Sequence, residues 1–154
     1  MIKFRLYEET DFDDLLEMIM SLYREDPEGE PIDEEKIRRT ITESRSCPEK
    51  LSIYMFSTGK LNIGYAILVY FWSNEYGGNF ISIDELYVKE PYRSQGIGTE
   101  FISFAERIEN KAALQLETTP GSSRALAYYR RLGFVPSQNT HLMRIKQEHS
   151  PDVN

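Results

Sequence analysis

The sequence predicts one domain of the α/β (α+β) class, in which helices pack on a mixed, mostly antiparallel sheet. Apolar residues alternate at period two in several stretches, which is typical of strands. Elsewhere they recur at helical spacing, as in the stripe that begins at Ile97. A strand, a helix and a second strand follow one another over residues 80–118. This order favours parallel pairing through a right-handed crossover.

The N-terminal half is expected to hold a strand, two helices and a hairpin. Residues 1–7 alternate and predict the strand. Thr10 offers an N-cap for a first amphipathic helix, and Asp33 begins a second one. Two runs rich in strand-forming residues, 51–57 and 61–72, flank a Thr-Gly-Lys turn and predict a hairpin.

The C-terminal half is expected to hold four more strands and two helices. In chain order these are a strand at 80–88, a helix from Gly96 to Ala112, a strand at 114–118, a helix at 123–132 and final strands at 134–135 and 142–145. Gly133 is a good stop signal for the second of these helices. The stretch 147–154 is polar, so we expect a single domain over 1–146 and a frayed tail.

Composition excludes several classes of protein. A net charge of -7 disfavours general binding to nucleic acid, although an acidic surface attracts cations such as polyamines or simply aids solubility. One cysteine, Cys47, and two histidines cannot form a disulfide or a closed zinc site, so no metal is expected. No apolar run reaches the ~20 residues that cross a bilayer, and the N-terminus does not resemble a signal peptide. A cytoplasmic location with no membrane contact is therefore expected.

The segment Arg93-Ser94-Gln95-Gly96-Ile97-Gly98-Thr99 carries the main functional signal. It lies between a strand and a helix, where glycines let backbone N–H groups approach an anion and the helix dipole favours negative charge. A nucleotide-binding P-loop would need a lysine after Gly98, and a dinucleotide fingerprint would need a third glycine where Phe101 stands. The segment therefore predicts a phosphate cradle of another kind.

This Arg-x-x-Gly-x-Gly pattern resembles motif A of the GNAT superfamily of N-acetyltransferases, which holds the pyrophosphate of acetyl-CoA. The preceding strand from Ile83 to Val88 and the Glu90-Pro91-Tyr92 turn are also similar to that family. Downstream, Ala125-Leu126-Ala127-Tyr128-Tyr129-Arg130-Arg131-Leu132-Gly133-Phe134 resembles motif B. Ser122 stands where the family often has asparagine. The matching core runs over about 61–144, and the N-terminal elements also suit the family.

The resemblance implies a GNAT fold with six to seven strands, about four helices and a V-shaped split between the strands at 80–88 and 114–118. It implies transfer of the acetyl group of acetyl-CoA to a primary amine, and dimers are common in the family, so a homodimer is possible. The residues implied in cofactor binding are Leu86, Tyr87, Val88, Arg93, Ser94, Gln95, Gly96, Ile97, Gly98, Thr99, Ser122 and Tyr129. The pyrophosphate would lie on the backbone of the motif A loop, and the pantetheine along main-chain groups of the strand.

Catalytic roles also follow from the resemblance. Tyr129 matches the tyrosine that donates a proton to the leaving sulfur, whereas Tyr128 is expected to pack in the core. The base is Asp84, the acidic position of polyamine-type members, with Glu85 as the alternative. Alternation would place Ser82, Asp84 and Leu86 on one face of the strand and Ile83, Glu85 and Tyr87 on the other. Either carboxylate can instead only orient a cationic substrate.

The acceptor pocket of the family is built from the first two helices, their loop and the turn after the long strand. Here those pieces carry carboxylates and aromatic side chains: Tyr23, Glu25, Asp26, Glu28, Glu30, Tyr70, Trp72, Asn74, Glu75 and Tyr76. Such a set suits an alkylammonium, so a polyamine or amino sugar is expected. The alternatives are a protein or peptide acetyltransferase of the same fold, and a non-catalytic acyl-CoA-binding module.

Overall fold

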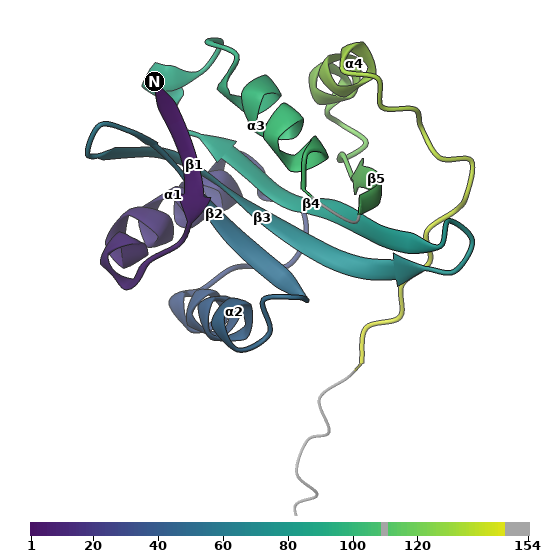
Figure 1. The fold of residues 1–154 in the computed structure, drawn as a ribbon, viewed down its shortest axis with the longest axis horizontal. Helices are drawn as coiled ribbons and strands as arrows, with labels where there is room; N and C mark the ends of the chain where they lie inside the picture. The colour runs from purple at the N-terminus through teal and green to yellow at the C-terminus, as the bar shows by residue number, and fades with distance from the viewer. Residues whose placement is uncertain (109–110, 147–154) are drawn as a thin grey trace, which may run out of the picture.

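One mixed sheet runs through the computed structural model, which describes residues 1–108 and 111–146 (Figure 1). Within these residues the sheet has five strands in the order β1-β2-β3-β4-β5. The strands are β1 (Ile2–Leu6), β2 (Leu51–Thr58), β3 (Leu61–Ser73), β4 (Gly78–Val88) and β5 (Lys111–Leu116). The first three pairs of neighbours are antiparallel and β4 pairs with β5 in parallel, as the strand-helix-strand order predicts. The predicted tail at 147–154 lies outside the described residues, so it stays a prediction.

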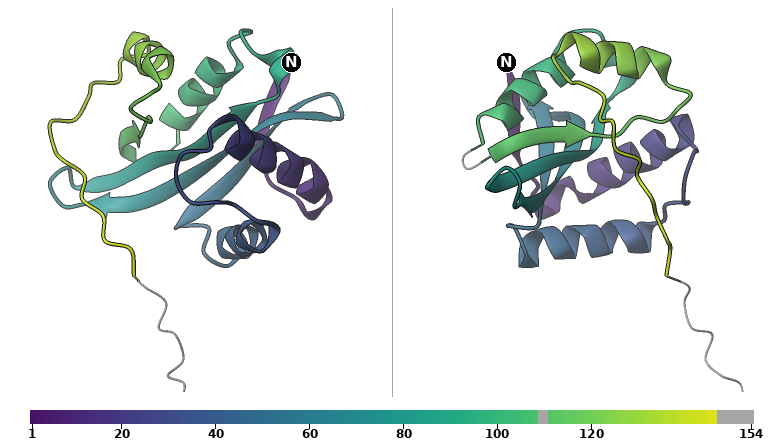
Figure 2. Two further views of the ribbon diagram at one scale, coloured as in Figure 1. Left: turned by 180° about the vertical axis from the view of Figure 1, so that it is seen from behind. Right: turned by 90° about the vertical axis from the view of Figure 1, so that its right-hand side faces the viewer.

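In the part of the chain that the structure describes, four helices cover the two faces of the sheet. They are α1 (Phe12–Glu25), α2 (Glu34–Ser46), α3 (Ile97–Glu106) and α4 (Ser123–Arg131), with short 3-10 turns at η1 (Glu9–Asp11) and η2 (Glu90–Tyr92). Helices α1 and α2 lie on one face, and α3 and α4 lie on the other (Figure 2). The predicted mixed sheet flanked by about four helices is therefore confirmed.

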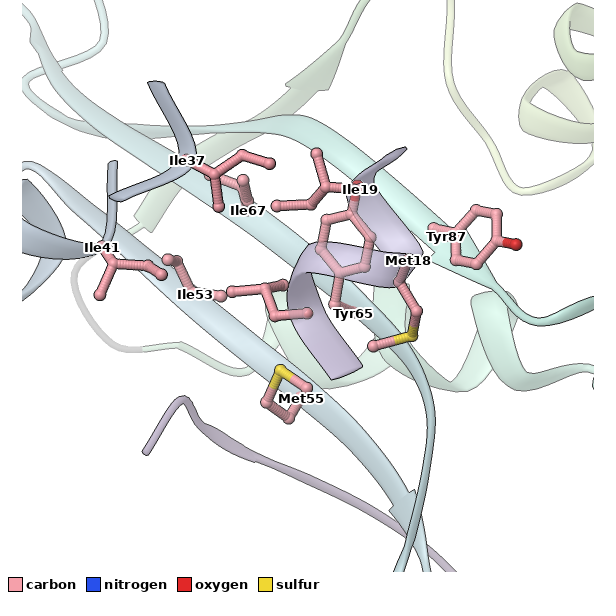
Figure 3. Packing of buried hydrophobic residues seen from close by; sticks show 10 residues of the cluster. Met18, Ile19, Ile37, Ile41, Ile53, Met55, Tyr65, Ile67 and Tyr87 are labelled. Atoms are coloured by element: carbon pink, nitrogen blue, oxygen red, sulfur yellow. The ribbon is translucent and has the colours of Figure 1, made fainter. Parts of the chain in front are cut away.

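Each face of the sheet has its own apolar core. On the α1–α2 face, Tyr65 is fully buried among isoleucines and methionines, and the Tyr87 hydroxyl points away from them (Figure 3). On the other face Phe56, Phe101 and Ile102 pack with partly buried residues of α4. The sheet lies between the two cores, and β3 and β4 contribute buried side chains to both of them.

The structure differs from the sequence expectations at several element ends. Helix α1 begins at Phe12 after the η1 turn, with Asp11 at its N-cap in place of Thr10, whereas Asp33 caps α2 by accepting a hydrogen bond from the Lys36 N–H at 2.8 Å. Helix α3 ends at Glu106, and the residues up to Ala112 that continue its apolar stripe already belong in part to β5.

The expected strands at 134–135 and 142–145 are not strands in the described residues, so the sheet has five strands and not six or seven. Pro136 has no N–H and cannot continue a ladder beyond Val135. Leu142, Met143 and Ile145 are 87%, 74% and 65% exposed, which places them off the sheet. The apolar alternation alone did not reveal that, among the described residues, this segment forms no ladder with β5.

The predicted split of the sheet is present between β4 and β5. Their pairing runs from Asn79 and Lys111 to Ile83 and Leu116 and stops there. Beyond that point β4 continues to Val88 on β3 alone. The last five residues of β4 therefore turn one hydrogen-bonding edge toward the gap, where an extended ligand can pair with it.

A bulge in β4 lies at the same place. Ile67 of β3 faces Glu85 and the next residue, Leu68, faces Ile83, so Asp84 is an extra residue without a partner on β3. The bulge reverses the alternation of side chains. As a result Ile83 and Leu86 both belong to the α3–α4 core, and Tyr87 belongs to the α1–α2 core. The expectation that Ile83 shares a face with Glu85 and Tyr87 is wrong for this reason.

A buried ion pair fastens the start of α1 to the sheet. The Asp11 carboxylate is 2% exposed. It accepts two hydrogen bonds from Arg5 at 2.7 Å, one from the Glu8 N–H at 2.9 Å and one from Asn62 at 3.0 Å. Burial alone raises the Asp11 pKa, but these donors outweigh it and hold the pKa below its ordinary value of 3.8.

Asp11→Asn is expected to lower the free energy of unfolding at pH 7 by about 2 kcal/mol, because charge-assisted bonds to a buried carboxylate are lost. A folded-state pKa that is lowered gives stability above the unfolded pKa and loses it as the pH falls through the folded pKa. The difference from wild type should therefore shrink below about pH 4. Urea unfolding at pH 7 and pH 3 measures it, with the exposed Asp13→Asn as control. A difference that stays constant with pH contradicts the charged role of Asp11.

Candidate active site

A cleft opens where β4 and β5 separate. Its volume is about 350 Å³. Side chains from the end of α1 and the following loop form one wall, β4 forms the floor, and the end of β5 and helix α4 form the other wall. The lining residues are Leu22, Tyr23, Asp26, Glu28, Ile83, Asp84, Glu85, Leu86, Leu116, Glu117, Thr118, Thr119, Ser122, Ala125 and Tyr129. The carboxyl ends of neighbouring parallel strands are where open sheets commonly place a ligand.

Glu85 is held at the floor of this cleft by two phenols. The Tyr65 hydroxyl donates to one carboxylate oxygen at 2.8 Å, and the Tyr23 hydroxyl of α1 donates to the other at 3.1 Å. Burial raises the pKa of Glu85, the two phenols counteract this, and the neighbouring Asp84 raises it further; the net shift is upward. A fixed carboxylate with a raised pKa can accept a proton nearer neutral pH than an ordinary one.

Asp84 is the bulged residue, and its side chain lines the same cleft. Asp84 is more exposed than Glu85, and among the described residues its carboxylate makes no hydrogen bond. Partial burial raises its pKa, and the negative charge of Glu117 across the split raises it further. Asp84 is therefore free to approach a ligand, whereas Glu85 is held in place.

Tyr129 reaches the cleft from α4. Its ring packs edge-on against Tyr128 at 5.0 Å and Phe134 at 5.6 Å between centroids. Burial, and then the neighbouring Tyr128, raise the pKa of Tyr129, so its hydroxyl keeps its proton at neutral pH. Tyr128 points elsewhere, because its hydroxyl lies 3.0 Å from the Thr99 hydroxyl of α3.

The loop before α3 has the backbone geometry of an anion cradle. Ser94 and Gly96 have φ values of 60° and 81°, in the left-handed region that glycine adopts most easily. The N–H of Glu100 donates to the Gly96 carbonyl at 2.9 Å and makes the first hydrogen bond of α3. The N–H groups before Glu100 lie at the start of the helix, which provides no carbonyl for them to bond. A Cβ at Gly98 would lie 3.1 Å from the Tyr128 hydroxyl, which is a tight contact, so a larger residue here would push against the Tyr128 side chain. These features fit a pyrophosphate.

Arg93 is turned away from this cradle in the structure. Its Nη2 atom lies 2.8 Å from both carboxylate oxygens of Glu25, at the end of α1, and its Nε donates to the Val88 carbonyl at 2.7 Å. That carbonyl is one of the main-chain groups expected to pair with pantetheine. The side chains of Leu86 and Tyr87 belong to the two cores, so a ligand meets their main chain first.

The cleft brings together part of the expected acceptor set, because Tyr23, Asp26 and Glu28 line it. Ser122, which was expected to contact the cofactor, lines the same cleft. Glu25 does not line the cleft and is paired with Arg93. The Tyr70 hydroxyl donates to the Ser52 hydroxyl at 3.1 Å, away from the cleft. The other expected acceptor residues that do not line the cleft are Glu30, Trp72, Asn74, Glu75 and Tyr76. Sequence reasoning did not single out Glu117 or Tyr65. Glu117 directly follows β5, and the position after a parallel strand is a signal that could have found it.

Within residues 1–108 and 111–146, no group of three or more metal-ligating side chains is present. No helix in this described part of the chain is long and apolar enough to cross a membrane. The side chains that line the cleft include carboxylates, phenols and hydroxyls.

The split between β4 and β5, with a tyrosine of α4 in the cleft, is the arrangement that the resemblance to N-acetyltransferases implies. The sequence model of the acetyltransferase (GNAT) family matches residues 14–134. The chain belongs to this family, and it is an acetyltransferase of the GNAT type. Such enzymes generally use acetyl-CoA and act on an amine acceptor.

Solved structures have the same fold. A possible acetyltransferase from Clostridium difficile 630 superposes with a TM-score of 0.82 at 20% identity, covering 96% of this chain and 99% of the other. A transcriptional regulator from Bacillus halodurans C-125 gives 0.78 at 21% identity, covering 94% and 100%. The aminoglycoside acetyltransferase meta-AAC0020 from an uncultured soil metagenomic sample, solved with sisomicin, gives 0.72 at 14% identity, covering 95% and 97%. Among curated proteins, no significant match is found.

Proposed function

We propose that this acetyltransferase transfers the acetyl group of acetyl-CoA directly to a primary amine of a small cationic metabolite, such as a polyamine or an amino sugar. The observation that carries the proposal is the charge of the cleft. Its lining includes Asp26, Glu28, Asp84, Glu85 and Glu117, and no lysine, arginine or histidine of the described residues lines it. Carboxylates in a partly enclosed cleft attract an ammonium group and favour its binding over a neutral amine.

The chain's own groups suit acetyl-CoA as the donor. The pyrophosphate would lie on backbone N–H groups from Gln95 to Thr99, where Gly96 and Gly98 leave room for it. The pantetheine arm would pair with the free edge of β4 at Leu86, beyond the last pairing with β5. Ser122 would offer a hydroxyl to the same arm. Acetyl-CoA supplies an activated thioester, and the chain supplies its orientation and the proton transfers.

Two proton transfers are assigned to three residues of the cleft. An alkylamine is almost wholly protonated at pH 7 and must lose a proton before it can attack. Asp84, free of a hydrogen-bond partner among the described residues, would take that proton directly or through a water, and Glu85 is the alternative. Tyr129 would donate a proton to the departing thiolate. A cytoplasmic setting, no role for nucleic acid or a membrane, and a possible homodimer stay part of the proposal.

The release of free thiol from acetyl-CoA tests the proposed substrate class. The panel contains 1,4-diaminobutane, spermidine, an aminoglycoside, a lysine analogue and a basic peptide, with butylamine as the matched monoamine. The second ammonium group of the diamine should lower KM about tenfold relative to butylamine, because it gains about 1.4 kcal/mol from the carboxylates. Turnover that is fastest with the peptide would favour the protein or peptide acetyltransferase, and an equal KM for the two matched amines contradicts recognition by charge.

A further inference from the structure

Arg93 connects the start of the motif A segment to the end of α1, which lies 68 residues away in the chain. Nη2 of Arg93 is 2.8 Å from both oxygens of Glu25, and Nε donates to the Val88 carbonyl at 2.7 Å. The guanidinium also lies over the Tyr87 ring, 5.2 Å from its centroid. The Tyr87 hydroxyl is 3.5 Å from the same Glu25 carboxylate. One side chain thus joins α1 to the final residues of β4.

The Arg93 side chain lies on the face of β4 that is opposite the cradle. Tyr87, which it covers, belongs to the core of α1 and α2. The Gly98–Tyr128 contact and the buried Ile97 belong to the core of α3 and α4. Since the Glu25 carboxylate already balances the charge of Arg93, a phosphate on the α3 side would have to replace an existing ion pair to recruit it.

Glu25 lies in the middle of the segment that forms one wall of the cleft. It is the last residue of α1, and the Asp26 N–H closes the helix by donating to the Leu22 carbonyl at 2.9 Å. Leu22, Tyr23, Asp26 and Glu28, all within three residues of Glu25, line the cleft. Whatever fixes Glu25 therefore fixes the side of the cleft where the acceptor amine is expected.

We propose that Arg93 is a positioning residue for the acceptor: its ion pair with Glu25 holds the end of α1 against β4 and keeps the acceptor wall in place. This inference rests on the proposed function for its effect on the amine. It predicts that Arg93 and Glu25 act as one unit, because each works only through the other. It also predicts that acetyl-CoA binds almost independently of Arg93, through the backbone of the loop.

A double-mutant cycle tests the unit. Arg93→Ala, Glu25→Ala and the double variant are compared with wild type for the amine KM and kcat by thiol release, and for acetyl-CoA affinity by calorimetry. Each single variant should raise the amine KM about fivefold, the double variant no further, and the acetyl-CoA dissociation constant should change less than about twofold. The matched control is Glu34→Ala, whose carboxylate accepts from Arg38 at 2.9 and 2.7 Å outside the cleft, and it should leave all constants unchanged.

Three results overturn the inference. A loss of acetyl-CoA affinity of about tenfold or more in Arg93→Ala but not in Glu25→Ala would make Arg93 a pyrophosphate ligand. Additive effects of the two substitutions would show that the residues act separately. Hydrogen exchange over residues 22–32 gives a readout without turnover: it should be faster in both single variants, and unchanged exchange also overturns the inference. If wild type acetylates no amine of the panel, the proposed function fails while the exchange measurement still decides on the ion pair.

Discussion

Tyr129→Phe is expected to lower kcat about 100-fold, because general acid catalysis by a positioned side chain contributes 10²–10⁴. Tyr129 lines the cleft, and burial raises the pKa of its hydroxyl, which therefore holds a proton at neutral pH that it can give to a leaving thiolate. Affinity for acetyl-CoA should change less than about threefold, since the ring and its packing on Phe134 remain. Steady-state thiol release gives kcat, and calorimetry gives the affinity.

Tyr128→Phe is the matched control for this substitution. Tyr128 is adjacent on α4, and its hydroxyl meets Thr99 at 3.0 Å instead of entering the cleft. Its loss should change kcat less than about threefold, with a stability cost of about 1 kcal/mol for one hydrogen bond. Equal losses of kcat in both variants would assign the effect to the packing of α4, and the acid role of Tyr129 would be refuted.

Asp84→Asn is expected to lower kcat/KM about 100-fold at neutral pH and to abolish its pH dependence on the acidic side. Burial and the charge of Glu117 raise the Asp84 pKa above its ordinary value of 3.8. A base must be ionised, so wild-type activity should fall as the pH drops through this raised pKa. Asparagine carries no titrating proton, and the acidic limb should flatten. The profile of kcat/KM between about pH 4 and pH 9 measures it, because this range begins near the ordinary pKa of a carboxyl group and ends below that of an alkylamine.

Glu85→Gln separates the two carboxylates. Glu85 is fixed by Tyr23 and Tyr65, and glutamine keeps one oxygen acceptor for these phenols but loses the charge. If Glu85 only orients the ammonium group, its variant keeps the acidic limb and raises KM. If the acidic limb disappears in Glu85→Gln and persists in Asp84→Asn, the assignments are reversed and Glu85 is the base.

Local patterns in the sequence predicted most elements of the fold. The stripe from Ile97 and the alternation in 51–57 and 61–72 depend on neighbours three, four or two positions away, which the sequence displays directly. The prediction of strands at 134–135 and 142–145 was wrong for a different reason. A strand exists only if a partner edge lies beside it, and no local pattern shows whether Leu142 and Ile145 come to lie beside β5.

The same limit applies to the cleft. The motif A loop and Tyr129 were predicted from their own short segments. The structure puts the loop before α3 and Tyr129 in the cleft, and their roles stay predictions. The faces of Asp84 and Glu85 depended on a bulge defined against Ile67 and Leu68 of another strand. The contacts of Glu85 with Tyr23, and of Arg93 with Glu25, join residues 62 and 68 positions apart. Such contacts depend on how α1 packs on the sheet. The sequence shows the two residues of each contact but not that they come together.

The bulge at Asp84 makes this position unusually open to protein engineering. A residue that faces no partner on β3 and lies in a cleft can be exchanged with little effect on strand register, whereas its neighbours Ile83 and Glu85 are bound to Leu68 and Ile67 across the sheet. A saturation library at position 84 should therefore yield mostly folded proteins, and differences among its members would report on chemistry. The bulge that turns residue 84 into the cleft therefore also allows this residue to change during evolution while the pairing of β3 with β4 stays the same.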